Sequence, residues 1–246
     1  AFNSAEAQAM LDAAKQAGVV HMVAHEFRWM PDRALFGRAI ADGLIGEPRF
    51  LAMDQFIPFC ADPATPLPHW WFDVAAGGGW LGAGGSHIVD QTRAWLGEFR
   101  SLSANLFTVS ERESAAEDSY SLRFAMASGV EGSMQQTAGA WGPMTTLWRC
   151  AGTRGTVWTE GGKVFVADKS GTRELPVPAD LVLPIAESFE LAPFIRLCEA
   201  LRDGIEGRAS RSAVAPPTFR DGLASMRILD AMRASSAEGG VLKQVS

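Results

Sequence analysis

The chain has 246 residues, of which 47% are hydrophobic and 20% are charged, and these proportions are typical of a globular protein with a sizeable core. Its formal net charge of −6 argues against a nucleic-acid or anionic-membrane partner, because both need a basic surface. The 3 cysteines lie far apart without metal-binding spacing, which indicates reduced thiols in the cytoplasm, and no apolar run is long enough to span a membrane.

The first part of the chain alternates between helical and strand patterns. Residues 4–17 are rich in alanine and are followed by Gly18, which predicts a helix with a glycine stop. The apolar run at 19–29 is nearly continuous and predicts a strand buried on both faces. A proline opens a second predicted helix at 31–41, and residues 47–59 form the next predicted strand.

The middle of the chain changes from irregular to strand-rich. Residues 60–79 combine prolines, aromatic residues and glycines without a regular period, and 86–97 then shows helical spacing. Short alternating runs with glycine turns fill 99–178, which predicts a series of antiparallel strands. The acidic residues Glu117 and Asp118 are interpreted as part of a solvated turn within this series.

The last part of the chain is helical again. Residues 191–205 carry an apolar stripe that includes Phe194 and Ile205, which predicts an amphipathic helix. A second helix is predicted at 217–237, and a short closing strand at 241–245. The whole pattern predicts an α+β fold with one mainly antiparallel sheet and helices grouped on one face.

Residues 77–82 read GGGWLG and fit the G-x-G-x-x-G pattern of a dinucleotide-binding loop. Such a loop must follow a buried strand, yet Pro66 and Pro68 precede it and disfavour a central strand there. The alternative is a turn in which the backbone passes close to another group, which glycine permits. We therefore interpret the stretch as a close-approach turn and assign no cofactor-binding residue.

His87 and Asp90 lie three residues apart at the start of a predicted helix, so their side chains share a face. Asp90 could accept a hydrogen bond from His87 and fix the protonation of its other nitrogen, an arrangement suited to general acid–base catalysis. The alternative is that His87 only packs at the helix start. His21 and His25 share a face of the predicted strand but have no further ligand at metal-binding spacing, so no metal site is predicted.

Three segments carry a resemblance to a known family. GGGWLGAGGSHIVDQTRAWLGEF, at 77–99, resembles the signature of the Gfo/Idh/MocA oxidoreductases, which are NAD(P)-dependent reductases and dehydrogenases of sugars, polyols and biliverdin-type substrates. The segment at 17–50 is similar to that family's last nucleotide-domain strand and the start of its second domain. The segment at 216–242 is similar to its closing helix.

The resemblance implies a large, mainly antiparallel open sheet with helices on one face, as in the C-terminal domain of dihydrodipicolinate reductase. It also implies that residues 1–27 are the end of a Rossmann domain and that residues 28–246 form a substrate-binding and oligomerisation domain. The family's glycine loop and the catalytic lysine of its E-K-P motif would precede this chain. We therefore expect NAD or NADP to serve the full-length protein, and we expect the chain alone to be inactive and to bind neither tightly.

The same resemblance implies roles for residues of the signature. His87 matches the family's catalytic general acid–base, and Asp90 matches the helix carboxylate that supports it. Many relatives have an aspartate four residues before the histidine, where this chain has Ala83. The family's carboxylate–histidine pair is therefore incomplete here, which puts strict alcohol dehydrogenase chemistry in question.

Further residues are placed on the substrate side by the resemblance. Arg28 would face the cleft, and His69, Trp70 and Trp71 would line it, with the tryptophans stacking on a sugar ring. The open sheet would pair with a second copy, giving a homo-oligomer that acts on a small-molecule substrate. The alternative function is a non-catalytic sheet module that binds a carbohydrate or a protein, which the incomplete carboxylate–histidine pair favours.

Overall fold

A sheet of nine strands forms the frame of the molecule in the computed structural model, which describes residues 1–209 and 214–245. The strands are β1 (Pro48–Phe56), β2 (Phe99–Phe107), β3 (Ser119–Met126), β4 (Glu131–Thr137), β5 (Thr145–Gly152), β6 (Gly155–Glu160), β7 (Lys163–Asp168), β8 (Gly171–Leu175) and β9 (Lys243–Gln244). The helices are α1 (Ser4–Ala17), α2 (Pro31–Ala41), α3 (Ser86–Leu96), α4 (Leu191–Ile205) and α5 (Phe219–Ala237), with short turns η1 (Glu26–Trp29), η2 (His69–Phe72), η3 (Leu81–Gly85) and η4 (Ala179–Leu181).

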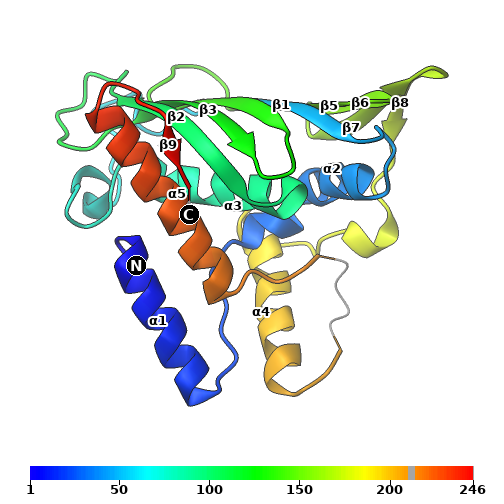
Figure 1. Cartoon of the computed structure of the whole chain (residues 1–246), viewed down its shortest axis with the longest axis horizontal. Coiled ribbons are helices and arrows are strands. Elements are labelled where there is room, and N and C mark those ends of the chain that lie inside the picture. The colour runs from blue at the N-terminus through cyan, green and yellow to red at the C-terminus, as the bar shows by residue number, and fades with distance from the viewer. Residues whose placement is uncertain (210–213, 246) are drawn as a thin grey trace.

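The strands lie side by side in the order β8-β7-β6-β5-β1-β4-β3-β2-β9. Within the described ranges, β1 and β4 run parallel and the other neighbouring strands run antiparallel. Figure 1 shows helices α2, α3 and α5 below one face of this sheet. The predicted fold, a mainly antiparallel sheet with helices grouped on one face, is thereby confirmed.

Local signals set the helix ends where the sequence predicts them. The Asn3 side chain accepts the backbone N–H of Glu6 at 2.9 Å at the start of α1, and Gly18 ends the helix with a φ of 63°. At the start of α5, Thr218 and Asp221 exchange side-chain and backbone hydrogen bonds in a capping box. The first and last predicted helices are therefore confirmed almost to the residue.

The main core lies between the sheet and the helices α2 and α3. Phe36 on α2 is fully buried, and its ring centroid lies 4.6 Å from that of Trp95 on α3. Trp95 in turn meets Trp148 of β5 edge-on at 4.7 Å. A Cβ at Gly37 would lie 2.4 Å from the Trp95 ring, so glycine at this position lets the two helices approach. This packing anchors the C-terminal end of α3, the helix whose first turns carry the predicted site.

The predicted strand at 19–29 is wrong. Residues 19–25 belong to no strand ladder, and η1 follows them. The one backbone–backbone hydrogen bond that ties residues 19–25 to a sequence-distant segment of the described chain runs from the N–H of Val23 to the carbonyl of Pro217, at 3.0 Å. Val19 and Val20 are 55% and 45% exposed. An apolar run becomes a strand only when other strands lie beside it, and no strand of the described chain does so here.

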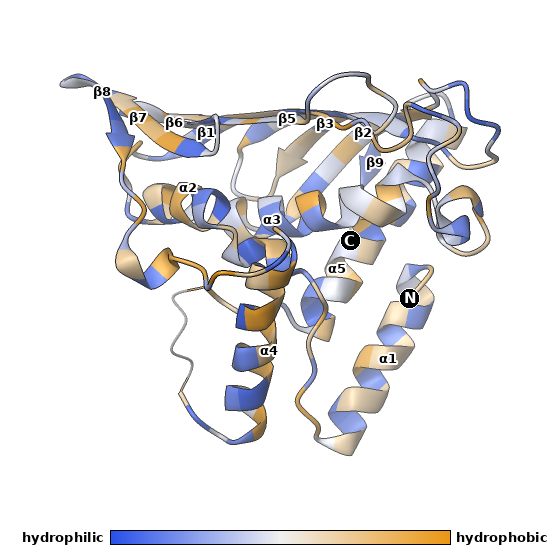
Figure 2. Cartoon of the chain, turned by 180° about the vertical axis from the view of Figure 1, so that it is seen from behind, coloured by the Kyte–Doolittle hydropathy of each residue, from blue (hydrophilic) through white to orange (hydrophobic). Residues whose placement is uncertain are grey.

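The apolar stripe predicted on α4 is only partly buried. Leu197 is 5% exposed, whereas Phe194 is 42% and Ile205 66% exposed. Figure 1 shows the reason: α4 projects downward, below α2 and α3, and only its first part lies near them. Figure 2 shows hydrophobic and hydrophilic residues along this helix. Among the helices of the described chain, none combines the length and apolar character that crossing a bilayer requires.

Candidate active site

The glycine stretch before α3 folds against its own chain. A Cβ on Gly78 would lie 2.1 Å from the carbonyl oxygen of Trp70, and one on Gly82 would lie 2.0 Å from that of Gly77. The backbone N–H groups of residues 77–81 all donate to oxygens of this chain, so none is free to hold a phosphate. The close-approach turn predicted here is therefore confirmed, and these residues do not fit a dinucleotide pyrophosphate.

A partly buried carboxylate that the sequence interpretation missed supports this turn. Glu117 accepts the backbone N–H of Leu81 at 3.0 Å, and its main-chain carbonyl accepts that of Trp80 at 2.8 Å. Burial raises the pKa of Glu117 above its ordinary value. The neighbouring Asp118 is 5% exposed and accepts two backbone N–H groups at 2.8 and 2.9 Å. The interpretation of both residues as a solvated turn is wrong, because each satisfies backbone donors that lie on other segments.

Helix α3 meets η1 through a buried ion pair. The Nε and Nη2 atoms of Arg28 donate to the two carboxylate oxygens of Asp90, each at 2.6 Å. Arg28 also reaches Asp221 Oδ1 and the carbonyl of Ala215, both at 3.1 Å. Arg28 is 7% exposed and Asp90 0% exposed. This bidentate ion pair and the contact of Arg28 with Asp221 fix the positions of η1, α3 and the start of α5 relative to one another.

The structure corrects the expected setting of Arg28 and Asp90. Arg28 was expected to face the cleft, but its guanidinium faces its acidic partners and a carbonyl in the interior. The expected hydrogen bond between Asp90 and His87 is also wrong. The imidazole beside Asp90 is that of His25, whose Nδ1 lies 3.0 Å from Asp90 Oδ1, although the contact does not meet the geometry of a regular hydrogen bond.

Asp90 is ionised despite its complete burial. Burial alone would raise the pKa of its carboxyl, but the contacts with His25 and Arg28 outweigh that cost and hold the pKa well below its usual range. A carboxylate in this state accepts hydrogen bonds and donates none. Every polar group turned toward Asp90 must therefore be a donor.

His87 sits in an apolar and positively charged environment. Its ring centroid lies 4.5 Å from that of Phe27 and 5.3 Å from that of His25. Its Nδ1 atom is buried and has no hydrogen-bond partner among the described residues. Burial, followed by electrostatic interactions with His25 and Arg33, lowers the pKa of His87 to about 3. His87 is therefore neutral at neutral pH and is available as a proton acceptor.

This lowered pKa predicts a loss of stability in acid that depends on His87. The ordinary histidine pKa is 6.5, so between that value and about 3 the unfolded chain binds a proton that the folded chain does not. The free energy of unfolding should then fall with decreasing pH, by up to about 2 kcal/mol from this group between about pH 7 and pH 5. Urea unfolding at both pH values should show that the free energy of unfolding falls less between them for His87→Asn than for the unchanged protein. The exposed His69, replaced in the same way, serves as the control, and an equal loss in all three proteins would contradict the prediction.

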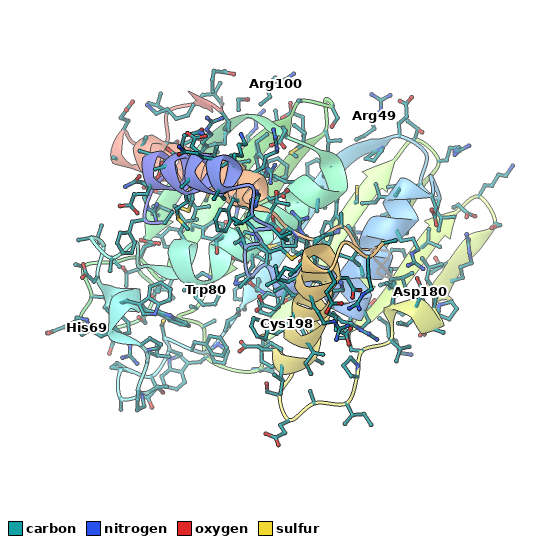
Figure 3. The ribbon with its side chains drawn as sticks, turned by 90° about the horizontal axis from the view of Figure 1, so that it is seen from below. Arg49, His69, Trp80, Arg100, Asp180 and Cys198 are labelled. Atoms are coloured by element: carbon teal, nitrogen blue, oxygen red, sulfur yellow. The ribbon has the colours of Figure 1, made fainter. Side chains whose placement is uncertain are left out.

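A cavity of about 620 Å³ opens between α1, α5 and the glycine turn. His25 and Trp70 line it together with mainly apolar side chains, and Ser86 lines it just before His87. Trp71 instead packs against Trp80 at 5.6 Å. Figure 3 shows His69 at the periphery of the molecule.

Of the predicted substrate-side residues His69, Trp70 and Trp71, the structure places Trp70 on the cavity wall. His25 also lines the cavity, although the sequence interpretation did not select it as a substrate-binding residue. No sequence signal marked His25, because its partner Asp90 lies on a distant helix. Within residues 1–209 and 214–245, no three or more His, Cys, Asp or Glu side chains gather closely enough to hold a metal ion.

Comparison with known proteins identifies several relatives. A family model described as the GFO/IDH/MocA C-terminal domain matches residues 35–158. A levoglucosan dehydrogenase from Pseudarthrobacter phenanthrenivorans is 38% identical over 104 residues, which cover 42% of this chain and 26% of that protein. A D-apiose dehydrogenase from Paraburkholderia graminis is 33% identical over 138 residues, which cover 53% of this chain and 33% of that protein. In both cases the match covers less than two thirds of the relative's own length.

Solved structures match the whole chain. Levoglucosan dehydrogenase in complex with NADH and L-sorbose superposes with a TM-score of 0.85 at 27% identity, covering 100% of this chain and 71% of that one. An oxidoreductase domain protein from Kribbella flavida superposes with a TM-score of 0.83 at 25% identity, covering 100% of this chain and 72% of that one. The sequence match and the shared fold together place the chain in the Gfo/Idh/MocA family of oxidoreductases.

Proposed function

We propose that this chain supplies the substrate-binding part of an NAD(P)-dependent oxidoreductase that acts on a sugar, polyol or related small molecule in the cytoplasm. In this proposal, residues 1–27 end a dinucleotide-binding domain, and residues 28–246 form the substrate-binding and oligomerisation domain. The observation that carries it is the buried Arg28–Asp90 pair with two neighbouring imidazoles, one of which, His25, lines an apolar cavity. The relatives named levoglucosan and D-apiose dehydrogenase, and the NADH in the similar structure, support the substrate class and the cofactor.

Within this proposal, His87 accepts the proton of a substrate hydroxyl. Its lowered pKa keeps the ring neutral, so a lone pair is available. Nδ1 is buried, whereas Nε2 has no hydrogen bond to any residue that the structure describes and is not sealed from solvent, which makes Nε2 the accepting atom. Trp70, 42% exposed at the cavity, offers an aromatic face on which a sugar ring can stack.

The experiment that tests the function places the dinucleotide domain of levoglucosan dehydrogenase before Ala1 and follows NAD⁺ reduction with levoglucosan, L-sorbose and D-apiose. We expect sugar-dependent reduction by the chimera and none by the chain alone. A chimera that binds NADH but reduces NAD⁺ with none of these sugars would instead favour a non-catalytic carbohydrate- or protein-binding module. The observation behind that second function is Ala83, which packs against the core where many relatives have a carboxylate.

The chain alone is expected to bind NADH weakly or not at all. The N–H groups of residues 77–81 are already used within the chain, and no strand leads into this turn within the described residues. Calorimetric titration of the chain with NADH checks this expectation. Low-micromolar binding would contradict it and would restore the glycine turn as a nucleotide site.

We further propose that the sheet joins two copies of the chain through the face without helices. Figure 1 shows the helices gathered on the opposite face. The uncovered face carries Phe50, Phe56 and Leu147, which are 47%, 50% and 37% exposed. The rings of Trp158 and Phe165 extend this surface, stacked at a centroid distance of 5.6 Å. Apolar groups spread over several strands of one face favour burial against a partner.

Sedimentation of the chain should therefore reveal a dimer or a larger assembly. The double substitution Phe50→Lys and Leu147→Lys is expected to shift it toward the monomer, because the charges would have to be buried at the interface. Val19→Lys, at an equally exposed apolar residue far from this face, is the matched control and should leave the assembly unchanged. A clean monomer of the unchanged chain at high concentration would count against the proposal.

A further inference from the structure

His25 is the imidazole that lies closest to the buried carboxylate. Its Nδ1 atom is 3.0 Å from Asp90 Oδ1, and the residue is 7% exposed. Asp90 is itself immobilised by the two hydrogen bonds from Arg28 at 2.6 Å. Neither the helical spacing of the signature nor the family resemblance assigns a role to His25. Its position is nevertheless the one in which a histidine is oriented by a fixed carboxylate.

The protonation of His25 follows from this contact. A bare nitrogen lone pair 3.0 Å from an ionised carboxylate oxygen would be repelled, whatever the angle between them. The proton of a neutral His25 must therefore reside on Nδ1, where it faces Asp90. Nε2 then carries a lone pair and acts as a hydrogen-bond acceptor.

The accepting edge of His25 is open to the cavity. His25 lines the cavity of about 620 Å³, and its Nδ1 is sealed from solvent on the side of Asp90. Nε2 is neither sealed nor engaged in any hydrogen bond of the described chain. The opposite edge of the ring is thus the one that a ligand in the cavity meets.

The remaining polar groups of the cavity suit a ligand with few hydroxyls. Ser225 lines it and is 2% exposed, and its buried hydroxyl has no hydrogen-bond partner in the part of the chain that the structure describes. Arg233 and Ser86 are the other polar side chains on the wall, and most of the rest is apolar. A buried hydroxyl without a partner is costly unless a ligand or water satisfies it. The cavity wall is therefore suited to a cyclic ligand that carries hydroxyl groups along one edge and has one apolar face.

We propose that His25, oriented by Asp90, accepts a hydrogen bond from a hydroxyl of the sugar or polyol in this cavity, and that Ser225 contacts a second polar atom of the same ligand. This inference rests on the proposed function for the class of ligand. It assigns to His25 a contact with substrate that is separate from the proton transfer assigned to His87.

The protonation is tested directly by long-range ¹H–¹⁵N correlation spectra of the histidine-labelled chain. We expect His25 to be protonated on Nδ1, and Asp90→Asn to abolish that preference. His21 serves as an internal reference with the opposite protonation pattern. Its Nδ1 accepts the backbone N–H of Phe219 at 3.1 Å and must therefore be unprotonated. A His25 proton found on Nε2, or a mixture of both forms in the unchanged chain, would overturn the inference without touching the proposed function.

The ligand contact is tested by adding levoglucosan, L-sorbose or D-apiose to the same sample. A sugar that binds should shift the Nε2 resonance of His25 and leave that of His21 unmoved. His25→Asn keeps a donor toward Asp90 but lacks the accepting atom, and it should weaken binding about 3- to 10-fold; His25→Gln places an amide near the Nε2 position and should weaken it less. Sugar binding that leaves His25 Nε2 unshifted overturns the inference alone. Absence of binding by all three sugars overturns both the inference and the proposed class of substrate.

Discussion

Replacing Asp90 by alanine is expected to lower the free energy of unfolding by about 3 kcal/mol, near the lower end of what removing one partner of a buried ion pair costs. The loss arises because Arg28 would remain buried, 7% exposed, without its two short hydrogen bonds. Asp221, 3.1 Å from Arg28, still offers a second carboxylate, and this keeps the effect from being larger. Urea unfolding at neutral pH measures the change.

Two further variants distinguish an ion-pair effect from a general loss of packing. The double substitution Arg28→Met and Asp90→Leu removes both charges and should destabilise the chain clearly less than Asp90→Ala alone. Asp168→Ala breaks a surface ion pair with Arg173, 2.7 Å long, and should lower the stability much less than Asp90→Ala. A double variant that is as unstable as Asp90→Ala would mean that the charge of Arg28 is not the source of the loss.

Replacing His87 by alanine in the two-domain chimera is expected to lower kcat about 10²- to 10⁴-fold with a much smaller change in KM, as for a general acid–base. Steady-state kinetics on the best sugar of the panel, with circular dichroism as a check on folding, provides the measurement.

Asp90→Asn should also lower kcat, but less strongly, because it disturbs the arrangement around the two imidazoles. Ala83→Asp should raise activity if the missing carboxylate limits the reaction. A kcat within about threefold for His87→Ala would make the histidine structural.

The sequence alone was sufficient for elements with strong local signals. The helix that ends at Gly18 and the helix that begins with the Thr218 capping box both depend on contacts within a few residues. The hairpin of β3 and β4 likewise needed only alternation and a turn containing Gly129. The segment at 19–29 failed for the opposite reason, because a strand depends on neighbours that local composition does not specify.

The candidate site was only partly predictable for a similar reason. Helical spacing places Asp90 and His87 on one face of α3, but it does not determine which imidazole the carboxylate meets. That choice is made by Arg28 and His25, which arrive from η1 and are far away in the sequence. The role of Glu117 was missed because its partners, the N–H groups of the glycine turn, lie on another segment. Long-range hydrogen bonds of this kind leave no periodic trace in a sequence.

The central place of β1 in the sheet determines the order in which the chain can assemble. Strands β2 to β4 and strands β5 to β8 are two meanders whose members follow one another in the sequence, so each can form by closing short loops. β1 precedes both meanders in the chain yet lies between β4 and β5, and it pairs with each of them. The two halves of the sheet are therefore joined only when this early segment inserts between two late ones. Because contacts of such long range form slowly, folding of the sheet waits for the docking of β1, and the unpaired edges of β4 and β5 are exposed until it arrives.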